Sequence, residues 1–204
     1  MTDVAAGYGR VAMSDDLRAT VLDAASGLLA EEGPEALTVR RIAARAGCST
    51  MGLYTSFGGK NGVVDALYAD GFTMLRKRLE TIEATSDPLA DLRLGCAAYR
   101  AMALEHPTYY RVMFDRAVPD HEPPPESLAN CLRTLGVLEH HVQRAIDAGR
   151  FRGDTVEIAH AIWATCHGLV SLELRELGHP PHAFAERFTY AIDALLTGLA
   201  SLAV

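Results

Sequence analysis

The sequence predicts an all-α fold, in which a small N-terminal helix-turn-helix domain is joined by a long helix to a larger helical domain. Apolar residues recur at helical steps of three and four along most of the chain, and no stretch shows the alternation typical of β-strands. The length of 204 residues suits a domain of about 60 residues followed by one of about 140. We expect a flexible N-terminus over 1–13, the helix-turn-helix domain over 14–60 and the second domain over 61–204.

Two short helices around a tight turn are predicted between residues 37 and 60. Thr38 is an N-cap residue directly before apolar residues at helical spacing, and Gly47 lies where a sharp turn requires a residue without Cβ. Ser49 then caps the second helix, whose buried side is expected to carry Leu53 and Phe57. The exposed side is expected to carry Thr50, Met51, Tyr54 and Thr55. Such a pair of helices forms the helix-turn-helix, whose second helix enters the major groove of DNA.

This part of the sequence is basic within an acidic chain. The charged residues between positions 36 and 62 are Arg40, Arg41, Arg45 and Lys60, so this window carries +4 although the whole chain has a formal net charge of −7. That asymmetry predicts a polyanionic partner.

The rest of the chain is predicted as a succession of helices separated by glycine and proline. Asp87 and Pro88 suit an N-cap and a first helical position, and His106-Pro107 ends the helix that they begin. A proline-rich loop contains Pro119 and residues 123–125. We expect these helices over 60–85, 88–106, 108–114, 126–148, 155–177 and 183–202.

A glycine turn between two amphipathic helices is common in small helical proteins, but residues 18–67 also resemble a known family. The matching pieces are VLDAA at 21–25, GPEALTVRRIAARAG at 33–47, LYTSF at 53–57 and Lys60. They are similar to the DNA-binding domain of TetR-type transcriptional regulators. Met51, Ser56 and Gly59 depart from the residues common in that family, so the resemblance implies no particular base preference.

The resemblance implies roles for ten residues in binding a double-stranded DNA operator. It places Arg40, Thr50, Met51 and Thr55 against base edges, and Thr38, Ser49, Tyr54 and Lys60 against phosphates. Arg41 and Gly52 complete the expected DNA-binding set. Arg40 is the expected reader of guanine, because its guanidinium can bond two acceptors at once; the alternative for Arg40 is a solvated surface arginine.

The last two predicted helices carry apolar residues over more than one face, and a helix of that kind must be covered on two sides. One side can pack in the domain's own core and the other against a second subunit, which gives a four-helix interface about a two-fold axis. The expected interface residues are Ile162, Leu169, Leu172, Phe188, Ile192, Leu195, Leu196 and Leu199. A homodimer would place two recognition helices about 34–36 Å apart, which matches a palindromic operator. The family resemblance implies the same dimer, and a monomer with a large core is the alternative.

The second domain is also rich in aromatic, sulfur and histidine side chains. Those expected to line an effector pocket are Tyr99, Met102, His106, Tyr109, Tyr110, Met113, Phe114, Trp163 and His167. Trp163, His167 and Gly168, with His106-Pro107 upstream, resemble the WHG subgroup of C-terminal domains in this family. Apolar walls with a few polar groups suit a small hydrophobic or aromatic molecule, and the resemblance implies release from DNA by such an effector. The alternative is an ordinary core of hydrogen-bonded aromatic residues.

Other functional classes find little support in the sequence. We find no GxSxG, P-loop, GxGxxG or HExxH motif, and therefore expect no enzyme, no catalytic residue and no cofactor. The four cysteines form no CxxC, and neighbouring His140 and His141 cannot chelate a metal alone, so no metal site is expected. No apolar run of 18 residues and no secretory signal is visible, so we expect a cytoplasmic protein without a membrane partner. Activation and ligand-independent regulation remain alternatives to repression.

Overall fold

The computed structural model describes residues 15–119, 121–178 and 183–202, and the expected flexible N-terminus over 1–13 lies outside them. The described residues form nine α-helices and one short 3-10 helix, without a β-strand, as the all-α prediction requires. The α-helices are α1 (Asp15–Glu32), α2 (Val39–Ala46), α3 (Thr50–Phe57), α4 (Lys60–Glu80), α5 (Pro88–Glu105), α6 (Pro107–Phe114), α7 (Pro125–Asp147), α8 (Thr155–Leu174) and α9 (Phe184–Ser201). The 3-10 helix (Pro34–Ala36) lies between α1 and α2.

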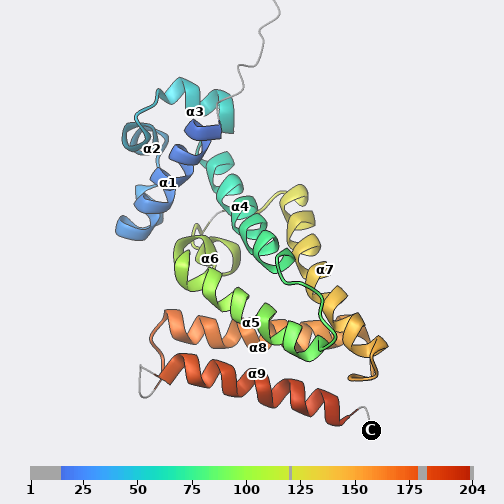
Figure 1. Ribbon diagram of the computed structural model, residues 1–204. Helices are drawn as coiled ribbons and strands as arrows, with labels where there is room; N and C mark the ends of the chain where they lie inside the picture. The colour runs from blue at the N-terminus through green and yellow to red at the C-terminus, as the bar shows by residue number, and fades with distance from the viewer. Residues whose placement is uncertain (1–14, 120, 179–182, 203–204) are drawn as a thin grey trace, which may run out of the picture.

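The helices form a small head and a larger body. Figure 1 shows α1, α2 and α3 grouped at one end, with α4 leading from this head into the body. In the body α4 packs against α5, α6 and α7, and α8 packs against α5, α7 and α9. The antiparallel helices α8 and α9 form the end of the molecule farthest from the head (Figure 1). Helix α4 is therefore the main structural link between the two parts.

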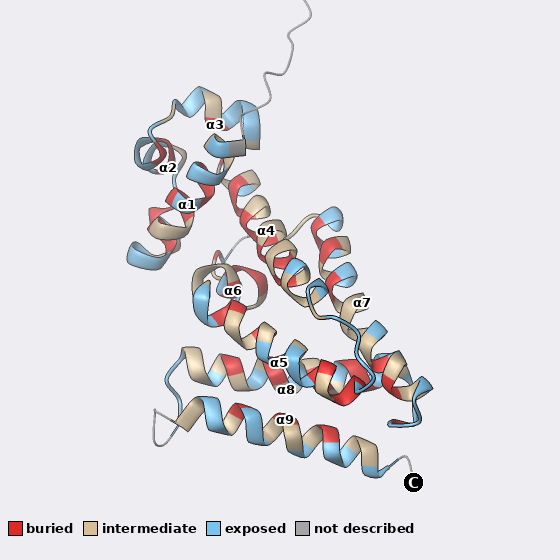
Figure 2. Cartoon of the chain, viewed as in Figure 1, coloured by how far each residue is buried: buried red, intermediate tan, exposed pale blue. Residues whose placement is uncertain are grey.

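Buried apolar side chains continue from the head through α4 into the body. Leu22, Ile42 and Leu53 are buried where α1, α2 and α3 meet. Figure 2 shows buried positions along α4 where it faces its neighbouring helices. Leu67 is one of the buried residues of this helix. Because interiors of this kind are closely packed, a displacement of one end of α4 cannot leave its neighbours unchanged.

Most helix boundaries agree with the predicted ranges to within two residues, but two helices end earlier. Helix α8 ends at Leu174 instead of residue 177, and α4 ends at Glu80 instead of residue 85. After Glu80 the Thr81 hydroxyl donates a hydrogen bond to the carbonyl oxygen of Arg78 at 2.7 Å, and this local bond competes with helix continuation. Tertiary contacts of Thr85 fix the rest of the segment as a loop.

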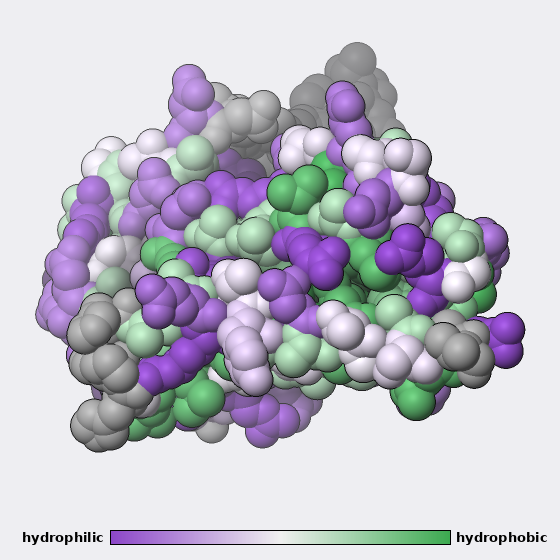
Figure 3. All heavy atoms as spheres, turned by 60° about the horizontal axis from the view of Figure 1, so that its bottom comes forward, coloured by the Kyte–Doolittle hydropathy of each residue, from purple (hydrophilic) through white to green (hydrophobic). Residues whose placement is uncertain are grey.

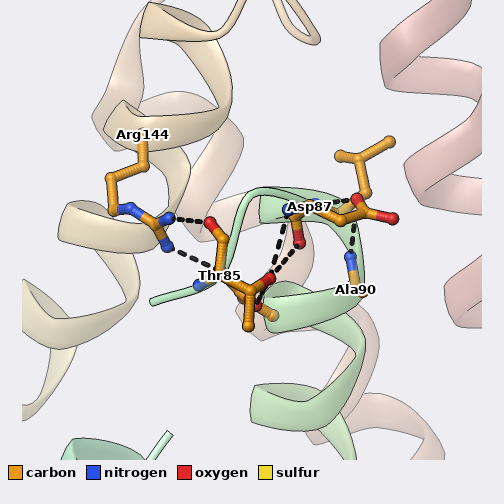
Figure 4. Close-up of polar contacts among 6 residues, drawn as sticks. Thr85, Asp87, Ala90 and Arg144 are labelled. Atoms are coloured by element: carbon orange, nitrogen blue, oxygen red, sulfur yellow. Dashed lines mark hydrogen bonds and ion pairs between the residues drawn. The ribbon is translucent and has the colours of Figure 1, made fainter. Parts of the chain in front are cut away.

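These contacts centre on the buried carboxylate of Asp91. It accepts hydrogen bonds from the backbone N–H of Thr85 at 2.9 Å and the Thr85 hydroxyl at 2.6 Å, and an ion pair from Nη1 of Arg144 at 2.6 Å. Arg144 also donates to the Thr85 carbonyl oxygen at 2.5 Å, so α7 is tied to the α4–α5 loop (Figure 4). Asp87 caps α5 as predicted, by accepting from the N–H groups of Leu89 and Ala90. Burial would raise the pKa of Asp91, but the hydrogen bonds and Arg144 outweigh burial and hold this pKa at about 2.

Candidate nucleic-acid interface and ligand cavity

The turn between α2 and α3 has the predicted capping. The side chain of Thr38 accepts a hydrogen bond from the backbone N–H of Arg41 at 3.3 Å, and that of Ser49 accepts one from Gly52 at 3.0 Å. Gly47 has a φ of 66°, the left-handed conformation that a side chain would disfavour. The turn that orients α3 is therefore determined by local sequence.

Helix α3 buries one side and exposes the other. Leu53 is fully buried and Phe57 is half-buried, whereas Met51 is 73% and Tyr54 is 55% exposed. Thr50 and Thr55 are also exposed, and Gly52 is half-buried. The residues expected to meet DNA thus lie on the accessible side of α3.

The basic residues of the head have different surroundings. Arg41 forms an ion pair with Glu32, and Arg45 with Glu31 at 2.5 Å, so the C-terminal end of α1 neutralises two cations of α2. Arg40 is exposed and Lys60 half-buried, and neither has an ion-pair partner within the described residues. The +4 counted from the sequence therefore overstates the charge available to a polyanion. Arg41 would have to leave Glu32 to meet DNA.

The residues expected to line one pocket divide between several environments. Tyr99 and Tyr110 are buried, with their hydroxyl oxygens 3.1 Å apart, and the Tyr110 hydroxyl lies 2.7 Å from Nδ1 of His167. Burial lowers the pKa of His167, so its ring is neutral and Nδ1 can accept a hydrogen bond from the Tyr110 hydroxyl. Phe114 packs beside this cluster, 5.0 Å from the His167 ring and 6.1 Å from the Trp163 ring between centroids. These contacts agree with the alternative of a hydrogen-bonded aromatic core.

Four other expected pocket residues do not line a cavity with Tyr99. Met102 is buried in the core, and His106 and Tyr109 are half-buried at the start of α6, with their ring centroids 6.1 Å apart. Met113 packs against α4 at Gly71, where the absence of a side chain allows a close approach. A Cβ at Gly71 would lie only 2.6 Å from the sulfur of Met113. Met113 thus joins α6 to α4.

Only Tyr99 and Trp163 of the expected set line the apolar cavity found among α4, α5, α7 and α8. Its volume is about 40 Å³, well below the roughly 300–1,000 Å³ of typical ligand sites. The other lining residues are Leu79, Ile82, Asp91, Leu92, Gly95, Cys96, Val137, Leu138, His141, Ile162 and Cys166. Most of them could not be predicted from the sequence, because they come from four separate helices and the loop after α4, and no single segment carries a distinguishing pattern.

An open cleft of about 1,040 Å³ separates part of the head from the body. It runs between the C-terminal end of α3, one side of α4 and the N-terminal part of α7, and includes Tyr54, Thr55 and Asn130. On this side the head has room to move relative to α7.

Helices α8 and α9 divide the expected dimer residues into two groups. Ile162, Phe188, Ile192 and Leu196 are buried inside the chain's own core, because α9 covers α8 and α5. They are therefore not surface residues, contrary to the expected interface. Leu172 is 47% exposed, and Leu169, Leu195 and Leu199 are half-buried.

The outer surface of α8 and α9 also carries apolar residues outside the expected set. Tyr190 is 77% exposed, and Leu177 is exposed beside a shallow pocket formed with Leu169, Leu172 and Phe184. Figure 3 shows this end of the molecule, where hydrophobic residues lie between hydrophilic ones.

The described part of the chain offers neither a metal-binding cluster nor a membrane-spanning helix. Among the described residues, no three His, Cys, Asp or Glu side chains are grouped so that they could hold a metal ion. The His140 and His141 rings are 5.9 Å apart between centroids and tilted by 71°. None of the helices in the described ranges has the length and apolar character needed to cross a bilayer.

A helix-turn-helix head with an accessible second helix, on an all-α body, defines a DNA-binding transcriptional regulator. Residues 21–67 match the family described as "Bacterial regulatory proteins, tetR family", and residues 92–195 match the "Tetracyclin repressor-like, C-terminal domain". The chain belongs to the TetR family of transcriptional regulators.

Solved structures agree with this assignment. A protein of unknown function from Rhodococcus sp. RHA1 is 29% identical, with a TM-score of 0.77 over 90% of this chain and 95% of that one. A TetR-family regulator from Pectobacterium atrosepticum is 26% identical, with a TM-score of 0.69 over 90% and 94% of the two chains. A TetR variant from Acinetobacter baumannii AYE, in complex with minocycline, shares the fold at 21% identity, with a TM-score of 0.62 over 91% and 97%. No curated protein sequence matches the chain.

Proposed function

We propose that this regulator is a homodimeric repressor that a small hydrophobic or aromatic molecule releases from a palindromic operator in the cytoplasm. The observation that carries the proposal is the position of α4. Its first residue, Lys60, lies at the expected DNA surface, and Leu79, near its other end, lines the apolar cavity. A helix of 21 residues spans about 30 Å, so α4 can link the two sites directly.

Within this proposal, the exposed side of the head contacts the operator. Arg40, Thr50, Met51 and Thr55 meet base edges, and Thr38, Ser49, Tyr54 and Lys60 meet phosphates. All of these residues are exposed except Lys60, which is half-buried, and this accessibility supports these roles. Gly52 allows close approach of the helix backbone, and Arg41 contributes only where it exchanges Glu32 for a phosphate.

The exposed apolar residues of α8 and α9 form the contact between subunits. Leu172 and Tyr190 are its most accessible apolar members, and Leu169, Leu195 and Leu199 lie beside them. Ile162, Phe188, Ile192 and Leu196 support this surface from inside the chain. A two-fold pairing through these helices presents both heads to adjacent major grooves.

Ligand binding and DNA binding oppose each other in this mechanism. A ligand that enlarges the cavity displaces Leu79 and the C-terminal part of α4, and the head follows because α1 is bound to α4 through Arg18 and Asp70. A change in operator affinity of about 100-fold requires a coupling free energy of about 2.7 kcal/mol. A protein with the same fold forms a complex with minocycline, which supports the idea that this regulator also binds a small molecule.

The proposal is tested by binding the purified protein to DNA fragments from upstream of its own gene, at controlled salt, with the stoichiometry of the complex measured. We expect a dimer, or a pair of dimers, on a palindrome, and weaker binding when an apolar effector is added. A ligand that binds tightly but leaves operator affinity unchanged would contradict the regulatory role. Transcription that rises with operator occupancy would replace repression by activation.

A further inference from the structure

A solvent-facing pocket lies directly against the apolar cavity. It has a volume of about 370 Å³ and is formed by the C-terminal part of α4, the segment that follows it and α7. Leu79, Ile82, Val137 and His141 line both this outer pocket and the cavity. These four side chains are therefore the wall between solvent and the interior of the body.

His141 differs from the other polar residues of the cavity in its hydrogen bonding. The Asp91 carboxylate is bonded to Thr85 and Arg144, and the Tyr99 hydroxyl lies within hydrogen-bond distance of Tyr110. In contrast, Nδ1 of His141 is buried without a hydrogen-bond partner in the described part of the chain. A buried polar atom of this kind is unfavourable, and a ligand that bonds to it removes the penalty.

The charges around His141 indicate what the ligand carries. Burial lowers the pKa of His141, and His140 and Arg144 lower it further against the opposite effect of Asp91, so the ring is neutral near pH 7. A neutral imidazole offers no counter-ion to an anionic ligand, and the neighbouring cation Arg144 is already paired with Asp91. The remaining walls are mostly aliphatic side chains and thiols.

We propose that the four-residue wall is the entrance to the cavity, and that His141 selects a neutral, mainly aliphatic ligand carrying one hydroxyl or carbonyl group. This inference rests on the proposed function in taking that ligand as the effector. The small cavity opens towards the outer pocket when the ligand enters. The polar group of the ligand remains at His141, and its apolar part makes the contacts inside the cavity that the wall side chains made before.

Gly95 provides a way to fill the cavity without disturbing its surroundings. A Cβ at this position would lie 3.8 Å from Cδ1 of Ile82 and 4.0 Å from Cδ2 of Leu79, which are ordinary van der Waals contacts. Gly95→Ala therefore occupies space just inside the wall and also favours helix α5. Gly168→Ala is the matched control, because it is a helical glycine whose Cβ would meet nothing within 4 Å.

The experiment uses the fluorescence of Trp163, the single tryptophan of the 204-residue sequence and a lining residue of the cavity. The protein is titrated with cyclohexanol and with cyclohexane, which have the same ring and differ by one hydroxyl group. We expect cyclohexanol to bind about three- to tenfold more tightly, as one added hydrogen bond predicts. His141→Phe should abolish this preference, and His141→Gln should restore part of it. His140→Phe, at the exposed neighbouring position, should keep it.

Gly95→Ala should weaken binding of both compounds, whereas Gly168→Ala should not. Thermal unfolding of each variant shows whether it is folded, and Gly95→Ala tests the site even where His141→Phe is unstable. The inference would be overturned if the wild-type protein bound neither compound. It would also be overturned if His141→Phe and His140→Phe lost the preference for cyclohexanol equally.

Measurements of operator affinity distinguish failure of the proposed function from failure of the proposed ligand site. Cyclohexanol that binds with the expected preference but leaves operator affinity unchanged supports the site and contradicts the regulatory proposal. An unrelated effector that releases DNA without altering Trp163 fluorescence, and regardless of His141→Phe, supports regulation and overturns the assignment of this entrance.

Discussion

Arg18 on α1 and Asp70 on α4 are joined by two parallel hydrogen bonds, with Nη1 2.7 Å from Oδ2 and Nη2 2.9 Å from Oδ1. This two-point contact fixes the angle between the head and the helix that leads to the cavity. Both side chains are partly exposed, so the pair contributes at most about 1 kcal/mol to global stability. Its main effect is on orientation.

Asp70→Asn should therefore alter the response to ligand more than it alters stability. We expect the midpoint of thermal unfolding to change by a few degrees at most, while the ratio of operator affinities with and without effector falls. Operator titrations at fixed salt, with and without effector, measure this ratio. Arg76→Gln, which breaks an ion pair with Glu80 within α4, is the control and should leave the ratio unchanged.

The different surroundings of the head cations lead to distinct salt dependences. Lys60→Ala should reduce the slope of log affinity against log salt by about one unit on any DNA, because a phosphate contact is lost. Arg40→Ala should instead relax the preference at one base pair in each half-site, at a cost of about 1–3 kcal/mol. Arg41→Ala should change the slope less than Lys60→Ala, since Arg41 already has a carboxylate partner. Identical behaviour of all three variants would refute this division of roles.

Asp91→Asn should destabilise the protein by about 2–4 kcal/mol, because it weakens hydrogen bonds to a charged, buried group and leaves Arg144 without its partner. The contribution of this carboxylate also depends on pH. Its pKa is lowered from 3.8 to about 2 in the folded chain, so its stabilisation is complete above pH 3.8 and is lost as the pH falls towards 2. Denaturant unfolding between pH 2 and pH 7 measures this pH-dependent contribution to the free energy of unfolding. The Asn variant should lose less stability than the wild type over the acidic range, and parallel losses would contradict the assignment.

Leu172→Asp should separate the subunits, because it places a charge on the exposed apolar surface of α8. We expect a monomer at micromolar concentration in sedimentation velocity, together with weaker operator binding. Leu132→Asp is a suitable control, because Leu132 is 66% exposed on α7 and lies outside the proposed interface. Dimers of unchanged stability in both variants would place the subunit contact elsewhere.

The local features of the head could be predicted from the sequence because they depend on neighbouring residues. A hydroxyl at Thr38 or Ser49 reaches the backbone N–H three residues later, and Gly47 adopts the turn conformation through its own lack of a side chain. These predictions need no knowledge of the rest of the chain, and the structure confirms them.

Features that depend on the meeting of distant segments could not be predicted in this way. The end of α4 depends partly on Thr85 meeting Asp91 and Arg144, and Arg144 lies 59 residues away in sequence. Similarly, the apolar residues of α9 have the same pattern whether they face a partner or their own core. Only the packing of α9 against α5 and α8 shows that Phe188, Ile192 and Leu196 lie inside.

The pairing of Arg41 and Arg45 with Glu32 and Glu31 has a consequence for how the protein searches a chromosome. Phosphate is present at every position of the genome, and a head with four free cations would spend much of its time on sequences without an operator. With two cations already neutralised, each head displaces fewer counter-ions from arbitrary DNA. We therefore expect a large fraction of the molecules to remain unbound between encounters and so available to find the few correct sites.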